Sequence, residues 1–216
     1  MKNIPIGISN FIQLLHDDCI YVDKTKEILH LINNNIYVSF SRPRRFGKSL
    51  TLNTIETLFT YGTEPYFKGT YIAGNNEDGT PRWTEPTYPV LRLDFSVIVA
   101  NDIPTLRSNF ITIINEQCHK LGIEEFPVEN KRIGDVLSAF TIRLNKTYVL
   151  LIDEYDAPLN ALIDKTEAFD AVREELRVFY ARIKDSSISG YLRLLLVTGI
   201  TRFREVSIFS AGTNII

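Results

Sequence analysis

The feature that most constrains the fold of this chain is a repeated alternation between short apolar runs and longer stretches with helical spacing of apolar residues. Neighbouring parallel strands need a crossover of about a dozen or more residues, usually a helix. The alternation therefore predicts an α/β fold of three layers with a mainly parallel sheet. We expect strands at residues 36–40, 88–96, 148–152 and 192–198, and helices at 48–59, 103–121, 132–145 and around 169–183.

Length and composition indicate one domain, expected to span residues 1–216, with a single core. Hydrophobic residues make up 44% and charged residues 23% of the chain, which argues against disorder and fibrous repeats. The formal net charge of −2 does not support nucleic-acid binding by this domain alone. Neither a signal peptide nor an apolar run of about 18 residues is found, so we expect a cytoplasmic protein without a membrane segment.

The first predicted strand leads into the sequence SRPRRFGKS, which ends like a phosphate-binding loop. In such loops backbone N–H groups and a helix N-terminus bind phosphate, a lysine supplies positive charge, and a hydroxyl joins Mg²⁺. Gly47, Lys48 and Ser49 have the required order. The first glycine of the usual pattern is replaced by Arg42, however, and Pro43 removes one N–H group, so a basic turn without a ligand stays an alternative.

A second candidate site follows the most apolar strand, where the sequence reads VLLIDEYD. In phosphate-loop ATPases an aspartate at this place holds the water shell of Mg²⁺, and a glutamate orients or deprotonates the attacking water. Asp153 and Glu154 match these roles. For Asp156 a cap on the following helix is favoured over a contribution to the Mg²⁺ shell. Because both candidate sites lie at carboxyl ends of parallel strands, we expect them at one edge of the sheet, where open α/β sheets bind ligands.

Three polar residues extend this prediction. Thr198 ends the last predicted strand and could present its hydroxyl to a γ-phosphate or to the attacking water, and Arg202 could stabilise charge on a transferred phosphoryl group. Asp94 ends the second predicted strand beside Ser96, where a local hydrogen bond is the favoured interpretation.

Arg44 and Arg45 have two interpretations. Their guanidinium groups could replace the amide donors lost at Arg42 and Pro43 and bind phosphate. Alternatively, they could point to solvent or pair with acids such as Asp94 or Glu154.

Five separated motifs resemble the AAA-ATPase-like family of bacterial proteins: YVDKT, SRPRRFGKSLTL, YPVLRLDFS, LLIDEYDAPL and VTGITRFREVSIFSAGTN. The resemblance implies an additional-strand ATPase core related to AAA+ proteins, in which the strand before Thr198 lies between the other two site strands. It also implies that Asp23 and Lys24 lie near the nucleotide base, and that the altered loop is a family variant.

The same resemblance implies that a nuclease-like domain of the PD-(D/E)XK type follows the ATPase domain. We therefore expect either a truncated chain or a short gene product, with a sheet that lacks its fifth strand unless residues 205–216 supply it. An oligomer is compatible with the sequence.

The predicted function is Mg²⁺-dependent ATP binding with slow hydrolysis, coupled to a conformational change. Two alternatives stay open: a nucleotide-gated regulatory module without turnover, and a phosphotransferase acting on a small molecule. We assign nucleotide contacts to Arg44, Arg45, Phe46, Gly47, Lys48, Ser49 and Leu50, metal contacts to Ser49 and Asp153, and catalytic roles to Glu154, Thr198 and Arg202.

Overall fold

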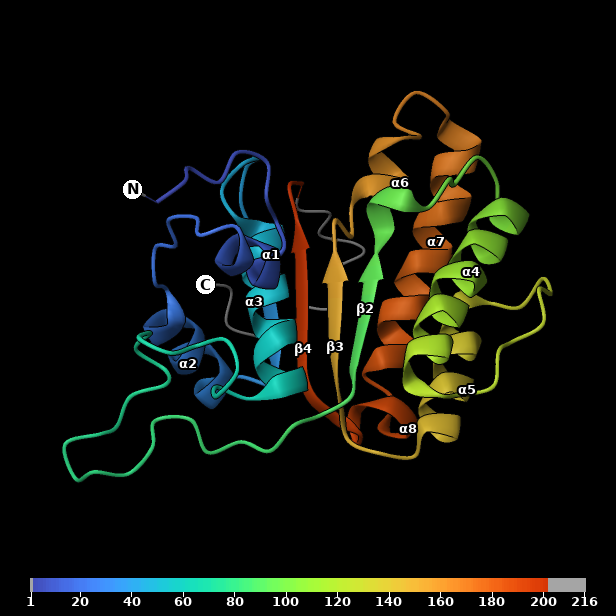
Figure 1. Cartoon of the computed structure of the whole chain (residues 1–216). Coiled ribbons are helices and arrows are strands. Elements are labelled where there is room, and N and C mark those ends of the chain that lie inside the picture. The colour runs from blue at the N-terminus through green and yellow to red at the C-terminus, as the bar shows by residue number, and fades with distance from the viewer. Residues whose placement is uncertain (1, 202–216) are drawn as a thin grey trace.

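A computed structural model describes residues 2–201, which form a four-stranded parallel sheet with helices on both faces (Figure 1). The strands are β1 (Tyr37–Ser41), β2 (Val90–Asp94), β3 (Tyr148–Asp153) and β4 (Leu192–Gly199). Their order in the sheet is β1-β4-β3-β2, so the last strand in sequence lies between the first and the third. The predicted α/β class and parallel sheet are confirmed, as is the inner position expected for the last strand.

The helices form two groups on opposite faces of the sheet (Figure 1). On one face lie α1 (Phe11–His16), α2 (Thr25–Asn34) and α3 (Lys48–Tyr61), and on the other α4 (Ile103–Leu121), α5 (Ile133–Leu144) and α7 (Thr166–Ile183). Short helices α6 (Ala157–Asn160) and α8 (Ser186–Ser189) flank α7. All four predicted helices are present, and α1, α6 and α8 are too short for apolar periodicity to reveal.

The second strand is shorter than predicted because the chain turns away after Asp94. The Asp94 carboxylate accepts hydrogen bonds from the Ser96 backbone N–H (2.9 Å) and hydroxyl (2.6 Å). These bonds start the 3₁₀ turn η1 (Phe95–Val97). The local hydrogen bond favoured for Asp94 is thus confirmed.

Two hydrophobic cores, one on each face of the sheet, hold the layers together. Alternate residues of each strand point to opposite faces, so Leu151 and Leu196 pack toward α3 while Leu150 and Leu195 pack toward α4, α5 and α7. The unbroken apolar runs of β3 and β4 follow from this double cover. The expectation of a single core is therefore wrong, because the sheet separates the buried residues into two clusters.

The polar segment 72–87 between α3 and β2 is largely exposed, but two of its apolar residues are buried. Ile72 and Trp83 are buried in the core beneath α3, where the Trp83 ring meets Phe59 at a centroid distance of 5.3 Å. Glu85 binds Arg193 at the start of β4 through both carboxylate oxygens. The segment is therefore fastened to the domain at both ends.

The end of β4 packs unusually closely on the chain that follows β3. A Cβ atom added to Gly199 would lie 2.5 Å from the Tyr155 ring and 2.6 Å from Asp156 Oδ1. The Asp156 carboxylate accepts hydrogen bonds from the backbone N–H groups of Ile200 (3.1 Å) and Thr201 (2.6 Å). The expectation that Asp156 caps α6 is wrong, because its carboxylate makes no cap bond there and holds the chain after β4 instead.

We expect Gly199→Ala to destabilise the domain by about 1–3 kcal/mol, because its methyl group overlaps Tyr155 and Asp156 and forces them to shift. The measurement is the free energy of unfolding in urea. Gly79→Ala serves as a control, because Gly79 has φ +84° but open space around its Cβ position, so only backbone strain of about 1 kcal/mol is added. Equal stability of Gly199→Ala and the wild type would show that this contact does not matter.

Candidate functional site

The parallel register brings the polar strand ends to one edge of the sheet. Thr198 on β4 pairs with Phe40 on β1, Val197 pairs with Ile152 on β3, and Asp94 on β2 pairs with Asp153. Asp153 and Thr198 therefore lie side by side, close to the point where β1 ends and its loop begins. This register brings the two candidate sites together at one edge of the sheet, as predicted.

The loop after β1 takes left-handed backbone conformations at Arg45 (φ 68°) and Gly47 (φ 76°). Gly47 then starts α3 as its N-cap residue, and Lys48 is the first helical residue. Arg42 is not among the residues with positive φ, and its backbone N–H donates to Gly199 O at 3.3 Å. Position 42 thus has no need of the conformational freedom of glycine, and the substitution there is tolerated without backbone strain.

Lys48 is nearly buried and has no carboxylate partner among residues 2–201, as expected of an anion-binding lysine. It is 5% exposed, and its Nζ donates to Pro43 O at 3.3 Å. Within residues 2–201 it forms no ion pair with a carboxylate. A nearly buried ammonium group without a counter-ion is costly, so this site is electrostatically suited to a phosphate at the N-terminus of α3.

Ser49 follows in the first turn of α3 and is half-buried. Its hydroxyl makes no hydrogen bond to any residue in the described part of the chain. Leu50 is also half-buried and faces a small cavity beside the loop. Ser49 is therefore free to donate or accept at the same helix end as Lys48.

Arg44, Arg45 and Phe46 are exposed, and the Phe46 side chain is 61% exposed. Neither arginine forms an ion pair in the described structure. The interpretation that they pair with Asp94 or Glu154 is therefore wrong here, since Asp94 is engaged by Ser96. Both guanidinium groups stay available beside the loop.

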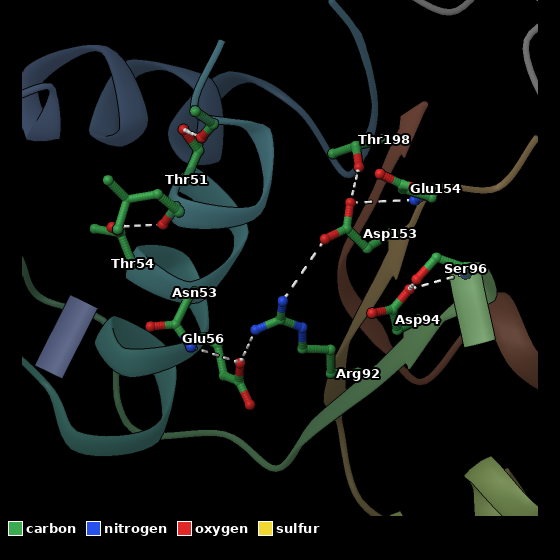
Figure 2. A network of polar contacts seen from close by, with 12 residues as sticks. Thr51, Asn53, Thr54, Glu56, Arg92, Asp94, Ser96, Asp153, Glu154 and Thr198 are labelled. Atoms are coloured by element: carbon green, nitrogen blue, oxygen red, sulfur yellow. Dashed lines mark hydrogen bonds and ion pairs between the residues drawn. The ribbon is translucent and has the colours of Figure 1, made fainter. Parts of the chain in front are cut away.

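Asp153 is the most constrained acid of the site and is 2% exposed. Its Oδ1 accepts hydrogen bonds from the Thr198 hydroxyl and from the Glu154 backbone N–H at 3.1 Å (Figure 2). Its Oδ2 has no hydrogen-bond donor among the described residues and lies 3.6 Å from Arg92 Nη2. One carboxylate oxygen is thus fixed by two donors, while the other keeps acceptor capacity.

Glu154 lies just beyond β3 with φ 48°, a left-handed conformation that is uncommon for residues other than glycine and occurs often at functional sites. Its backbone N–H donates to Asp153, and its carbonyl accepts from Ala157 at 2.9 Å. The half-buried side chain has no hydrogen bond or ion pair to any residue between 2 and 201. Its carboxylate can therefore act on a ligand or a water molecule.

Three residues connect to this site that are not among the predicted site residues: Asn53, Glu56 and Arg92. Arg92 Nη1 donates to Glu56 Oε2 at 2.9 Å, and Asn53 Nδ2 donates to the same oxygen at 3.3 Å (Figure 2). Arg92 could have been noticed, because it is the one charged residue in the apolar run VLRL before Asp94. Nothing in the sequence indicates that it meets Asp153.

Two cavities flank the loop on the side of α2. One has a volume of about 160 Å³ and the other of about 680 Å³, and both are lined by Lys24, Ile28 and Thr51. Tyr21 borders the smaller cavity, and burial raises the pKa of its hydroxyl. An organic group attached to a phosphate on Lys48 would have space here.

Asp23 fixes the chain between these cavities and the segment 72–87. Its carboxylate accepts from the backbone N–H groups of Thr25 (2.8 Å) and Tyr71 (2.7 Å). Partial burial opposes ionisation, but hydrogen bonds from Thr25 and Tyr71 outweigh it and lower the pKa of Asp23. Asp23 therefore has a structural role in this fold, while Lys24 lines both cavities.

Among residues 2–201 no group of three or more His, Cys, Asp or Glu side chains could hold a metal ion. A site that uses one carboxylate, one hydroxyl and substrate phosphates is nevertheless typical of Mg²⁺. The same part of the chain contains no helix long and apolar enough to cross a membrane. Arg202 and the proposed fifth strand at 205–216 lie outside the described residues.

Comparison with known proteins gives a family match and one curated relative. The model of the AAA-ATPase_like family, described as predicted AAA-ATPase, matches residues 5–209. A protein of Azotobacter chroococcum mcd 1, described as an uncharacterized protein in the vnfD 5′ region, is 36% identical over 219 residues. The alignment covers 99% of this chain and 40% of that protein, so the chain spans less than half of its relative. No solved structure matches the chain.

We expect Thr198→Val to lower the free energy of unfolding by about 1–3 kcal/mol, because the buried Asp153 carboxylate loses a hydroxyl donor while the side-chain volume barely changes. Thr198→Ser is the matched control, since it keeps the hydroxyl and should recover part of the loss. Urea unfolding measures both. A valine variant as stable as the wild type would show that this hydrogen bond contributes little.

Proposed function

The chain belongs to the predicted AAA-ATPase family, and from this premise we propose that it binds ATP with Mg²⁺ and hydrolyses it slowly to drive a conformational change. The observation that carries the proposal is Lys48, a nearly buried cation at the start of α3 that has no carboxylate partner among residues 2–201. A phosphate group supplies the missing negative charge. The strand order β1-β4-β3-β2 supports assignment to the additional-strand type of ATPase core.

Phosphate binding is assigned to the loop and the first turn of α3. Backbone N–H groups of Gly47, Lys48 and Ser49 would bind the β- and γ-phosphates, with the Lys48 ammonium beside them. Arg44 and Arg45 are exposed at the loop entrance and would add guanidinium donors. Phe46 and Leu50 would contact the nucleotide beside the cavities near Lys24.

The metal position is assigned to Ser49 and Asp153. The free hydroxyl of Ser49 and the open Oδ2 of Asp153 are oxygen donors of the kind that Mg²⁺ accepts directly or through water. When bound, Mg²⁺ neutralises charge on the phosphate oxygens during phosphoryl transfer. The protein contributes Asp153 already oriented by Thr198 and by the Glu154 backbone N–H.

Hydrolysis is assigned to Glu154 and Thr198. The Glu154 carboxylate, which pairs with no side chain in the described part of the chain, would accept a proton from the attacking water. The Thr198 hydroxyl hydrogen is engaged by Asp153, so its oxygen would accept a hydrogen bond from that water rather than donate to phosphate. A charge contribution by Arg202 is proposed from sequence alone.

We expect Lys48→Ala to weaken ATP binding about tenfold or more, because it removes a charge-assisted bond to phosphate. Isothermal titration with ATP and Mg²⁺ measures the dissociation constant. Lys146→Ala is the matched control, since Lys146 is exposed in the turn before β3, at the opposite edge of the sheet. An unchanged affinity in Lys48→Ala would remove the basis of the proposed function.

The two neighbouring acids should give different defects. We expect Asp153→Asn to reduce the Mg²⁺ dependence of ATP binding, because a neutral amide binds the metal shell poorly. Glu154→Gln should keep binding and lose turnover, because an amide cannot take a proton from water. Phosphate release and titration separate the two effects. No phosphate release by the wild type despite ATP binding would favour the regulatory module without turnover.

A further inference from the structure

Arg92 occupies an unexpected position for a charged residue. It lies in the middle of β2 on the face that packs toward α3, where neighbouring strand positions are filled by Val90, Leu151 and Leu196. Its side chain is 22% exposed. A partly buried charge on this apolar face is stabilised by nearby anions.

Two carboxylates share this guanidinium group (Figure 2). Arg92 Nη1 lies 2.9 Å from Glu56 Oε2 in α3, and Nη2 lies 3.6 Å from Asp153 Oδ2 in β3. The contact with Glu56 is a hydrogen bond, whereas the contact with Asp153 is a longer ion pair. Arg92 therefore bridges the two acids and binds Glu56 more closely.

The contact with Asp153 falls on the oxygen that has no other partner in the described structure. Oδ1 is fixed by the Thr198 hydroxyl and the Glu154 backbone N–H. Oδ2 is thus the oxygen able to face a metal ion, and it has a fixed positive charge beside it before any metal arrives. Removing Arg92 would leave the Asp153 carboxylate oriented by its two donors.

The Glu56 carboxylate is also held by a second donor, Asn53, which lies in the same helix. Asn53 Nδ2 donates to Glu56 Oε2 at 3.3 Å, and Asn53 Oδ1 accepts from the Phe11 backbone N–H. These contacts tie Glu56 to α1 and leave it a stable second acceptor for Arg92.

We propose that Arg92 is a positioning residue whose charge lies beside the metal-facing oxygen of Asp153 when no Mg²⁺ is bound, and that Glu56 holds this charge alone when Mg²⁺ binds with the nucleotide. The inference rests on the proposed function, because it assumes that Asp153 serves the metal. It assigns opposite effects to the two partners. Arg92 opposes Mg²⁺ electrostatically, and Glu56 draws Arg92 away and thereby favours Mg²⁺.

The experiment measures binding of a fluorescent ATP analogue at graded Mg²⁺ concentrations and low ionic strength. We expect Arg92→Gln to lower the half-saturating Mg²⁺ concentration by roughly three- to tenfold, since a nearby positive charge is lost. Glu56→Gln should raise it by roughly the same factor, since Arg92 is then left to Asp153 alone. The double variant should follow Arg92→Gln, because Glu56 acts only through Arg92.

A purely structural ion pair would shift both single variants in the same direction or in neither, and either result overturns the inference. Arg193→Gln is the matched control, since the Arg193–Glu85 pair is similarly exposed, at 20% for each side chain, but lies at the opposite end of the sheet. It should leave the Mg²⁺ dependence unchanged. If Arg92→Gln does not fold, Glu56→Gln and Arg92→Lys decide: the first must raise the half-saturating concentration, and the second must stay nearer the wild type.

Failure of the inference differs from failure of the proposed function. A wild-type chain that does not bind the analogue at any Mg²⁺ concentration contradicts the proposed function and the inference together. Mg²⁺-dependent binding by the wild type, with no opposite shifts in the variants, overturns the role of Arg92 and leaves the nucleotide site intact.

Discussion

The in-register pairing of four parallel strands determines where each polar residue of the site lies. Pairing of Asp94 with Asp153, of Ile152 with Val197 and of Phe40 with Thr198 sets the strand ends level with one another. A shift of one residue in β4 would turn Thr198 to the opposite face of the sheet and away from Asp153. Both faces of β4 are buried, so a shift of one residue would exchange Leu194 and Leu196 with Leu195 and Val197 between the two cores and disturb the packing of each.

Much of this arrangement could be predicted from the sequence, because it depends on local patterns. Apolar runs predict the four strands found in residues 2–201, and helical spacing predicts the helices α3, α4, α5 and α7. The predicted ends of these elements differ from the observed ends by a few residues. The loop residues Gly47 and Lys48 and the acids Asp153 and Glu154 were found because each follows a strand. Their roles toward a ligand stay predictions, since residue placement alone does not test them.

The remainder could not be predicted because it depends on contacts between distant segments. Asp156 looks like a cap in the sequence, but its oxygen is taken by backbone N–H groups of Ile200 and Thr201, 44 and 45 residues away. Arg92 pairs with Glu56 across 36 positions of the chain, and no local pattern links them. Trp83 is buried despite its polar surroundings in sequence, because the Phe59 ring offers it an apolar surface.

The backbone of the loop after β1 explains why an arginine can stand at position 42 without strain. A glycine is needed where the backbone is left-handed or where a Cβ atom would collide. In this loop the left-handed residues are Arg45 and Gly47, whereas Arg42 continues the ladder to β4 through its backbone N–H. The Pro43 carbonyl accepts a hydrogen bond from the Lys48 ammonium group. Proline therefore lacks a backbone donor but still provides an acceptor that holds Lys48 at the start of the helix. The loop therefore has fewer free backbone donors at its entrance, while the turn from Gly47 to Ser49 leads directly into the N-terminus of α3, where the proposed phosphate would bind.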